Sequence, residues 1–245
     1  MYEVLLNEIT ATHSELALCA FIKNFESEDK PDEKERILLS EGIYDRADII
    51  EKIYPIAICS TDSMVRGISP NRVTKLYKKE LIMKVIPECP DNVSIGEDLV
   101  STLSAITKCN RLCVIRDFYP YHYRINNASM IQSYSDTKYQ KIKNLNKALI
   151  AINEKNDSVF STQIANDYIR LILDTIEQEI LLSGYDYKRL KSDIKDEAKS
   201  DSFIHSLKIA DKKRINRKVK LYTFLIKLRL WSAIIFIRKI YSKIR

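Results

Sequence analysis

From about Ser135 to the C-terminus, apolar residues recur at helical spacing, and this feature limits the possible folds more than any other. Residues three and four apart share one face of an α-helix, so the pattern predicts helices that pack through one apolar side. Breaks in the pattern lie near 156–158, 183–184 and 200–201. We therefore expect an α-helical C-terminal region, in which the periodic positions form the core and carry no chemistry: Leu149, Ile152, Ile164, Tyr168, Leu171, Ile172, Ile176 and Ile180.

The first 135 residues have a different pattern, in which helical and strand-like segments alternate. The chain has only 4 glycines, which argues against a Gly-rich sandwich or propeller, and it has no Gly-rich phosphate loop. Alternation of helices and strands predicts an α/β layer. We expect helices at 2–12, 45–54, 72–82 and 99–108, and strands at 16–25, 112–116 and 121–125. The predicted organisation is an α/β part (1–135), a helical region (136–211) and a basic C-terminal helix (212–245).

Charge is distributed unevenly along the chain, whose formal net charge is +7. The segment 212–245 holds twelve Lys or Arg residues and no Asp or Glu, so the first 211 residues hold 28 basic and 33 acidic side chains, a net −5. An acidic body with a basic tail indicates that the tail contacts an anionic partner.

The basic tail also has a charge-free side if it forms one helix. Ile226, Leu230, Ile237, Tyr241 and Ile244 fall on that side, with Lys and Arg residues around it. Such a helix fits the surface of an anionic membrane. Two alternatives are that the helix packs on the body with its lysines in water, or that the basic run binds nucleic acid. The large apolar share of the tail, and the lack of a nucleic-acid motif, favour the membrane.

The sequence predicts neither a signal peptide nor an ordinary transmembrane helix. The N-terminus lacks a basic region followed by a long apolar run, and the most apolar stretch, 221–237, is interrupted by Lys227 and Arg229. The 5 cysteines include no CxxC pair. They predict neither a zinc site nor a disulfide framework, but reduced and mostly buried thiols in a cytosolic protein.

The segment 94–99 (SIGEDL) places two adjacent carboxylates after a glycine and before an apolar helix. Ser94-x-x-Glu97 has the spacing of a capping box, and acids in a first helical turn suit the helix dipole. The functional interpretation is that one carboxylate is a general base, which takes the proton from a sugar hydroxyl as it attacks an anomeric carbon. The two interpretations are compatible, because a cap can also aim a catalytic acid.

Four segments in this order, with their gaps, carry a resemblance to bacterial family 2 glycosyltransferases of the GT-A fold, which build surface polysaccharides such as capsules. They are 75–82 (KLYKKELI), 96–98 (GED), 119–124 (YPYHYR) and 128–130 (ASM). In that family a KLYKRELI helix, a GED that opens a helix, an aromatic strand ending in Y-Y-R and a Ser-hydrophobic step follow one another. The opening MYEVLLNEI…ELALCAF is similar to the helix and strand after the family's metal-binding DxD loop. The resemblance covers residues 1 to about 135.

The resemblance implies roles for individual residues. Asp98 matches the family's proposed catalytic base and Glu97 is its neighbour. His122, Arg124 and Ser129 match a mobile segment near the donor diphosphate, where Arg124 would offer a forked charge to a phosphate. The structural alternatives are an exposed arginine on an edge strand and a half-buried structural histidine.

The KLY segment adds Lys75 to the expected substrate- and donor-binding residues. The resemblance further implies a nucleotide-sugar donor, a glycan or lipid-linked acceptor and a divalent Mg²⁺ or Mn²⁺ ion. It implies a cytoplasmic enzyme that lies peripherally at the inner face of the cell membrane, with no nucleic-acid partner.

One part of the family pattern has no counterpart in this sequence. The family binds its donor with an N-terminal Rossmann-like half that ends in the DxD motif, and neither precedes Tyr2. The candidate pairs Asp29/Asp32 and Asp45/Asp48 lack the DxD spacing, so no metal ligand is predicted in this chain. We therefore expect the acceptor side of a glycosyltransferase. The alternative is a non-catalytic, membrane-associated interaction protein or a decayed transferase.

Overall fold

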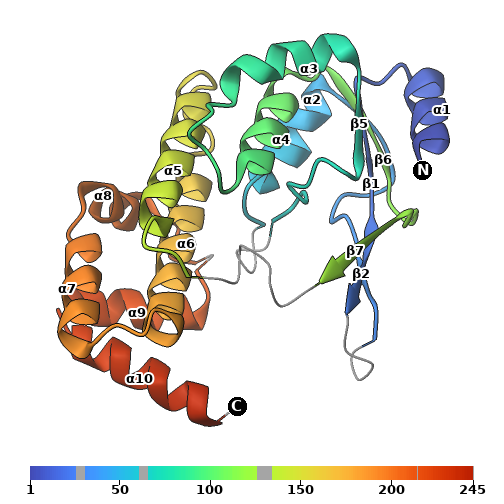
Figure 1. Cartoon of the computed structure of the whole chain (residues 1–245). Coiled ribbons are helices and arrows are strands. Elements are labelled where there is room, and N and C mark those ends of the chain that lie inside the picture. Colours follow the sequence, from blue (N-terminus) through green and yellow to red (C-terminus); the bar gives the residue numbers. More distant parts are fainter. Residues whose placement is uncertain (26–30, 61–65, 126–133, 214, 245) are drawn as a thin grey trace.

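The computed structural model describes residues 1–25, 31–60, 66–125, 134–213 and 215–244. Figure 1 shows an α/β part that contains the N-terminus beside a helical part that ends at the C-terminus, which confirms the predicted fold class. The α/β part comprises α1 (Tyr2–Thr12), β1 (Leu16–Cys19), β2 (Phe21–Phe25), β3 (Glu33–Glu35), β4 (Gly42–Asp45), α2 (Arg46–Asp48), η1 (Ile49–Ile53), η2 (Tyr54–Ile56), β5 (Lys75–Tyr77), α3 (Lys79–Val85), η3 (Ile86–Glu88), α4 (Glu97–Lys108), β6 (Arg111–Ile115) and β7 (Tyr121–Ile125).

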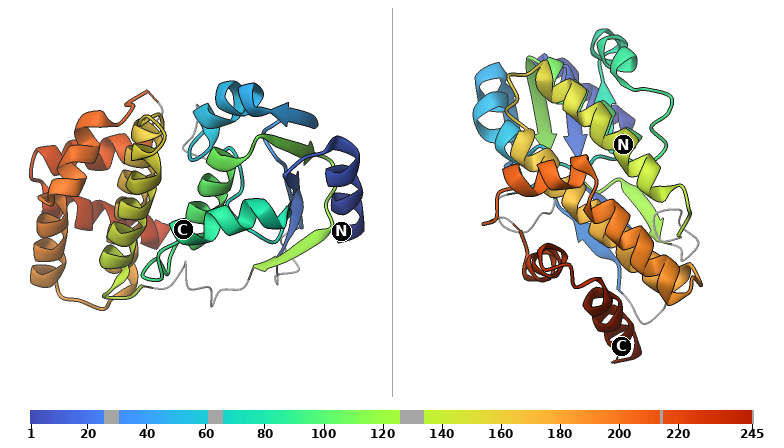
Figure 2. Two further views of the ribbon diagram at one scale, coloured as in Figure 1. Left: turned by 90° about the horizontal axis from the view of Figure 1, so that it is seen from above. Right: turned by 90° about the vertical axis from the view of Figure 1, so that its left-hand side faces the viewer.

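The main sheet has the strand order β4-β6-β1-β5, in which β1 and β6 run parallel and the two outer strands run antiparallel to their neighbours. Every residue of β1 is buried, because both faces of the sheet are covered. Ala17 and Cys19 pack against α1, whereas Leu16 and Leu18 belong to the larger core that includes α4. Figure 2 shows α1 on one side of the strands and α3 and α4 on the other.

A second, three-stranded sheet has the order β3-β2-β7, with β2 parallel to β7. The predicted strand at 16–25 is therefore two strands, which separate at Ala20 and join different sheets. The amide of Ala20 donates to the carbonyl of Phe118 at 3.1 Å, at the point where the chain leaves the main sheet. The apolar run carries no signal for this change, because no Gly, Pro or other turn residue separates the two strands.

The predicted helix at 72–82 is wrong in its first half. Residues Lys75–Tyr77 form β5, which pairs antiparallel with β1, and the helix α3 begins only at Lys79. The two faces of the strand explain the result: Leu76 packs with the α1 side and Tyr77 with the α4 side of the sheet. Pairing with a buried strand outweighs the helix propensity of three residues.

The helical part contains α5 (Lys138–Glu154), α6 (Ser161–Leu182), α7 (Tyr187–Ala198), α8 (Asp201–Ile209), α9 (Arg217–Lys227) and α10 (Trp231–Ile244). The three predicted breaks coincide with helix ends. Ser158 has φ 58° in the first break, Gly184 has φ 71° in the second, and the Ser200 side chain accepts from the Phe203 amide in the third. The boundary near residue 135 stays a prediction, since the first core cluster includes Leu149 and other residues beyond it.

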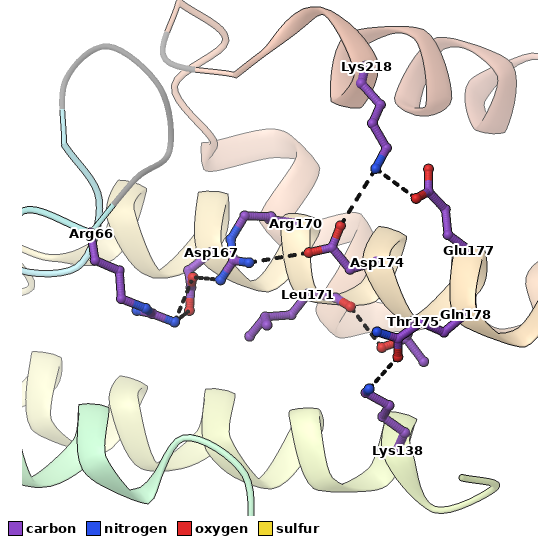
Figure 3. Close-up of polar contacts among 10 residues, drawn as sticks. All are labelled: Arg66, Lys138, Asp167, Arg170, Leu171, Asp174, Thr175, Glu177, Gln178 and Lys218. Atoms are coloured by element: carbon purple, nitrogen blue, oxygen red, sulfur yellow. Dashed lines mark hydrogen bonds and ion pairs between the residues drawn. The ribbon is translucent and has the colours of Figure 1, made fainter. Parts of the chain in front are cut away.

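A line of charged side chains runs along α6 (Figure 3). These side chains form ion pairs with Arg66, which precedes β5, and with Lys218 of α9. Asp167, only 1% exposed, accepts from Arg66 at 3.2 Å and from Arg170 at 2.7 Å. Burial alone would raise the pKa of Asp167, but the two guanidinium groups outweigh it and hold the pKa below its ordinary value. Farther along, Lys218 of α9 lies 2.7 Å from Glu177.

The basic tail is two helices rather than the single predicted helix. The amide of Arg229 donates to the Ile226 carbonyl and that of Leu230 to the Leu225 carbonyl, both at 2.9 Å, and Arg229 has φ 58°. These two bonds form a Schellman motif, which ends α9 and turns the chain before α10.

The expected charge-free side of the tail is divided between core and solvent. Ile226 is buried and Ile237 packs against the helical core, whereas Leu230 and Tyr241 are exposed. The Ile244 side chain lies outside the described part of the structure. None of the described helices combines the length and the low charge that crossing a membrane requires.

Candidate active site

The predicted catalytic segment lies where α4 begins beside β5. Gly96 is the N-cap of α4 and has φ 78°, a left-handed conformation that favours glycine. No side chain in the described part of the chain caps the helix, and its N-cap is Gly96, so the predicted capping box of Ser94 and Glu97 is wrong. The Gly96 Cα faces α5 closely: a Cβ atom there would lie 2.6 Å from Leu145 Cδ2. The backbone of Gly96, packed on the helical part, therefore positions the two carboxylates.

The two carboxylates of the first turn have different surroundings. Glu97 is exposed, whereas the Asp98 side chain is 34% exposed and forms an ion pair with the Nε of Arg72. Arg72 lies in the turn before β5. In that turn Asn71 Oδ1 accepts from the Thr74 amide at 3.2 Å and from its hydroxyl at 2.6 Å. The ion pair and the turn hold the Asp98 carboxylate at the surface, where a solvent-borne hydroxyl can reach it.

Lys75, the first residue of β5, is only 5% exposed. Its ammonium group donates to the carbonyl of Ser69 at 2.7 Å and to that of Asn71. Burial lowers the pKa of Lys75 to about 7, with the negative charge of Asp98 acting in the opposite direction. In this structure Lys75 therefore stabilises the turn that contains Arg72 through two hydrogen bonds to its backbone. A role of Lys75 in substrate binding stays a prediction.

Two residues of this cluster were missed by sequence reasoning. The Tyr77 ring packs on the α4 side, and burial raises the pKa of its hydroxyl to about 12, with Asp98 adding to the effect. For Arg72 the sequence predicts only a place in the helix expected at 72–82. The sequence does contain a signal for Tyr77. On a strand, Lys75 and Tyr77 would point to one face and Leu76 to the other. This alternation is overlooked when a helix is expected at 72–82.

The residues predicted to contact the donor lie on the second sheet. His122 and Arg124 are exposed on β7, and His122 Nδ1 lies 3.0 Å from Asn24 Oδ1 on β2. Among the described residues, no hydrogen bond or ion pair connects either side chain with Asp98. Ser129 lies outside the described residues.

The described residues do not fit the divalent metal that the family resemblance implies. Among them, no group of three His, Cys, Asp or Glu side chains lies close enough to hold a metal ion. The chemistry that this part of the molecule can support is therefore that of a surface carboxylate held by the Arg72 guanidinium. Such a group can accept a proton from a hydroxyl.

Comparison with known proteins places the fold but not the family. No family model matches the sequence, and no curated protein matches it. The crystal structure of S. aureus TarS residues 1–349 matches with a TM-score of 0.51 at 12% identity, and the match covers 99% of this chain and 62% of that one. TarS in complex with UDP-GlcNAc matches with a TM-score of 0.47 and TarS in complex with UDP with 0.46, both at 12% identity. They cover 99% and 100% of this chain and 63% of each neighbour.

This chain therefore spans less than two thirds of the structure it resembles. At 12% identity the likeness concerns the arrangement of helices and strands alone. The chain has a glycosyltransferase-like fold, consisting of an α/β part that carries Asp98 and a helical C-terminal part.

Proposed function

We propose that this chain is the acceptor-side part of a glycosyltransferase, in which Asp98 acts as the general base. The observation that carries the proposal is the position of Asp98, which is half-exposed at the start of α4 in a glycosyltransferase-like fold and is paired with Arg72. The carboxylate takes the proton from an acceptor hydroxyl as its oxygen attacks the anomeric carbon of the donor. The bond from that carbon to the nucleoside diphosphate breaks in the same step. Glu97, exposed beside it, adds negative charge to the site.

The donor in this proposal is a nucleotide sugar and the acceptor is a growing surface polysaccharide. TarS, whose fold this chain resembles, is known in complex with UDP and with UDP-GlcNAc, which supports a nucleotide-sugar donor. Arg124 and His122 are exposed on β7 and are available to a diphosphate; Ser129 and Lys75 complete the proposed substrate contacts. Any divalent ion would need ligands beyond the described residues, so no step of the proposal runs through it.

The test is sugar transfer by the protein together with the segment that binds the donor, measured with a panel of nucleotide sugars. Asp98→Asn keeps the size of the side chain and removes its basicity, so transfer falls by at least about a hundredfold. Asp91→Asn, on the exposed loop before α4, is the matched control and retains activity. Circular dichroism and thermal unfolding confirm that both variants fold. Transfer at the wild-type rate by Asp98→Asn refutes the assignment of the base.

A second proposal concerns the tail, which we infer contacts an anionic membrane surface from the cytoplasmic side. The exposed apolar side chains of α9 and its C-cap follow helical spacing at Leu221, Phe224 and Leu228, and Phe236 of α10 is 67% exposed. Basic residues surround them, including exposed Lys220, Lys227, Arg229 and Lys239. Apolar side chains between lysines and arginines combine burial in the interface with attraction to anionic lipids. This observation also favours the alternative of a membrane-associated protein without catalysis.

Vesicle flotation tests the tail proposal. The full chain floats with vesicles that contain phosphatidylglycerol at low salt, and Phe224→Ser with Phe236→Ser reduces the bound fraction several-fold because apolar burial is lost. Met83→Ser, an exposed apolar side chain on α3, is the control. If the wild-type chain stays with the soluble fraction at low salt, the membrane proposal fails. Binding to duplex DNA that weakens steeply with salt would instead support the nucleic-acid alternative.

A further inference from the structure

A pocket of about 340 Å³ lies in the helical part, among elements other than those that carry Asp98. Its walls come from the first half of α5, the end of α6, one face of α7, and Tyr134 and Asp136. The pocket is polar, and neither the proposed transfer reaction nor the membrane contact uses it. The residues that decide its chemistry are Tyr134, Tyr139, Glu179 and Asp193.

Glu179 is a buried carboxylate that faces this pocket with one oxygen unpartnered. The Glu179 residue is 0% exposed, the Tyr139 hydroxyl donates to Oε2 at 2.6 Å, and Oε1 has no hydrogen-bond partner among the residues that the structure describes. A buried carboxylate oxygen without a donor is costly, because the water that it lost is not replaced. The free oxygen therefore points to a ligand that donates a hydrogen bond.

The charge of the pocket indicates that this ligand is a cation. Lys143 forms an ion pair with Glu197, with 2.6 Å between Nζ and Oε2. Arg189 lies 3.8 Å from Asp136 and 3.6 Å from Asp193, at the edge of ion-pair distance. Its guanidinium carbon sits 3.4 Å from the centre of the Tyr185 ring instead. Five carboxylates thus face two basic groups: Asp136, Glu179, Asp193, Asp196 and Glu197 against Lys143 and Arg189.

The lining favours an organic cation over a metal ion. Among the described residues no three acidic, His or Cys side chains are placed to hold a metal. An ammonium group needs fewer oxygens and also gains from the face of an aromatic ring. We propose that this pocket binds an aliphatic primary amine as its ammonium ion, with Glu179 Oε1 accepting a hydrogen bond, Asp193 as second carboxylate and Tyr134 as the aromatic wall.

Occupation of the pocket is coupled to a proton. Burial raises the pKa of Glu179 to about 7, whereas the hydroxyls of Tyr139 and Tyr134 oppose the shift. The facing carboxylate of Asp193 adds to the rise, through its charge and through a hydrogen bond that only protonated Glu179 can donate to it. Glu179 is therefore partly protonated at neutral pH. When the ammonium ion binds, the O–H bond of the protonated carboxyl breaks, its proton leaves to solvent, and no other covalent bond changes. Binding thus strengthens as the pH rises from 6 to 8, provided that the amine stays charged.

Calorimetric titration of the full chain with putrescine tests the proposal. At pH 7 and low salt, one molecule binds, and the apparent enthalpy differs between buffers of different ionisation enthalpy because a proton is released. Glu179→Gln keeps the shape and removes the charge, and weakens binding about tenfold or more. Asp193→Asn also weakens binding. Glu154→Gln, exposed on α5, leaves binding unchanged. The experiment involves no sugar, so its outcome is independent of the transferase proposal.

Several outcomes would overturn the proposal. Tetramethylammonium carries the charge without an N–H donor, and equal affinity for it would exclude the hydrogen bond to Glu179. Tighter binding of Mg²⁺ in competition with putrescine would assign a metal to the pocket. Equal binding by wild type and Glu179→Gln, or no binding by wild type, also contradicts it. If Glu179→Gln does not fold, Asp193→Asn decides the matter, because the Asp193 side chain is 35% exposed and tolerates the change.

Discussion

Single side chains near Asp98 show how burial determines which groups stay charged. Asp98 is partly in water and has Arg72 as its partner, whereas Lys75, a few residues away in the chain, is almost fully buried. The Lys75 ammonium replaces lost water with two backbone carbonyls rather than with a carboxylate. Hydrogen bonds to neutral acceptors compensate a buried charge only in part, so its pKa falls.

The lowered pKa of Lys75 makes stability depend on pH. A lysine in the unfolded chain keeps its proton up to its ordinary pKa of 10.5, whereas folded Lys75 releases it near 7. Between these values the unfolded state binds more protons, so the contribution of Lys75 to the free energy of unfolding rises with pH. We expect the stability difference between wild type and Lys75→Met, from urea unfolding at pH 6 to 9, to grow in favour of wild type. A constant difference would show that Lys75 is not desolvated.

At the scale of elements, the start of α4 depends on a glycine that serves two purposes. Gly96 adopts a positive φ at the N-cap and leaves room for Leu145 of α5. A helix normally begins with Ser, Thr, Asp or Asn, which supply a capping oxygen. Here close contact between α4 and α5 takes precedence over a side-chain cap, and this contact determines where Asp98 lies.

Gly96→Ala tests this dual requirement. The new Cβ would both strain the backbone and lie 2.6 Å from Leu145 Cδ2, so we expect a loss of about 2–4 kcal/mol in chemical denaturation. Gly184→Ala is the control, since Gly184 has φ +71° but nothing within 4 Å of the added Cβ. Its loss should be about 1 kcal/mol. If both variants lost the same free energy of unfolding, the contact with Leu145 would make no contribution to stability.

At the scale of the whole molecule, buried charges and shared apolar clusters connect the α/β part with the helices. Arg66, which precedes β5 in the chain, reaches Asp167 on α6, and the first core cluster includes residues of α4, α5 and α6. The buried Gln163 side chain adds a polar link, because its Oε1 accepts from the amides of Ile58 at 3.0 Å and Cys59 at 3.1 Å. The two parts are therefore joined by buried contacts, both apolar and polar, and not by surface contacts alone.

Asp167→Asn measures the strength of this attachment. Removing the carboxylate leaves Arg66 and Arg170 partly buried without their shared partner, and we expect a loss of about 3 kcal/mol in urea unfolding at pH 7. Asp174→Asn, whose side chain is 43% exposed, should cost less than about 1 kcal/mol. The folded pKa of Asp167 lies below its ordinary 3.8. The difference from wild type is therefore steady at neutral pH and shrinks only as the pH falls below about 4. A loss no larger than that of Asp174→Asn would contradict the network.

The five cysteines illustrate a property that their number and spacing in the sequence predict. Their spacing predicts free thiols, and the structure has all five free, with only Cys89 less than fully buried. Burial raises the pKa of Cys19 to about 11 and that of Cys109 to about 12, so these thiols are weak nucleophiles at neutral pH.

The sequence by itself determined the class of the fold, the breaks between the C-terminal helices and the helix that carries Asp98, because these follow from local periodicity and turn residues. Tertiary structure alone decided that Lys75–Tyr77 form a strand, that Gly96 replaces a capping box and that the tail divides at Arg229. Tertiary structure alone also brought Arg72 to Asp98 and left Glu179 with a free oxygen. These features depend on partners distant in the chain, whose pairing and packing outweigh the local preferences that a sequence reveals.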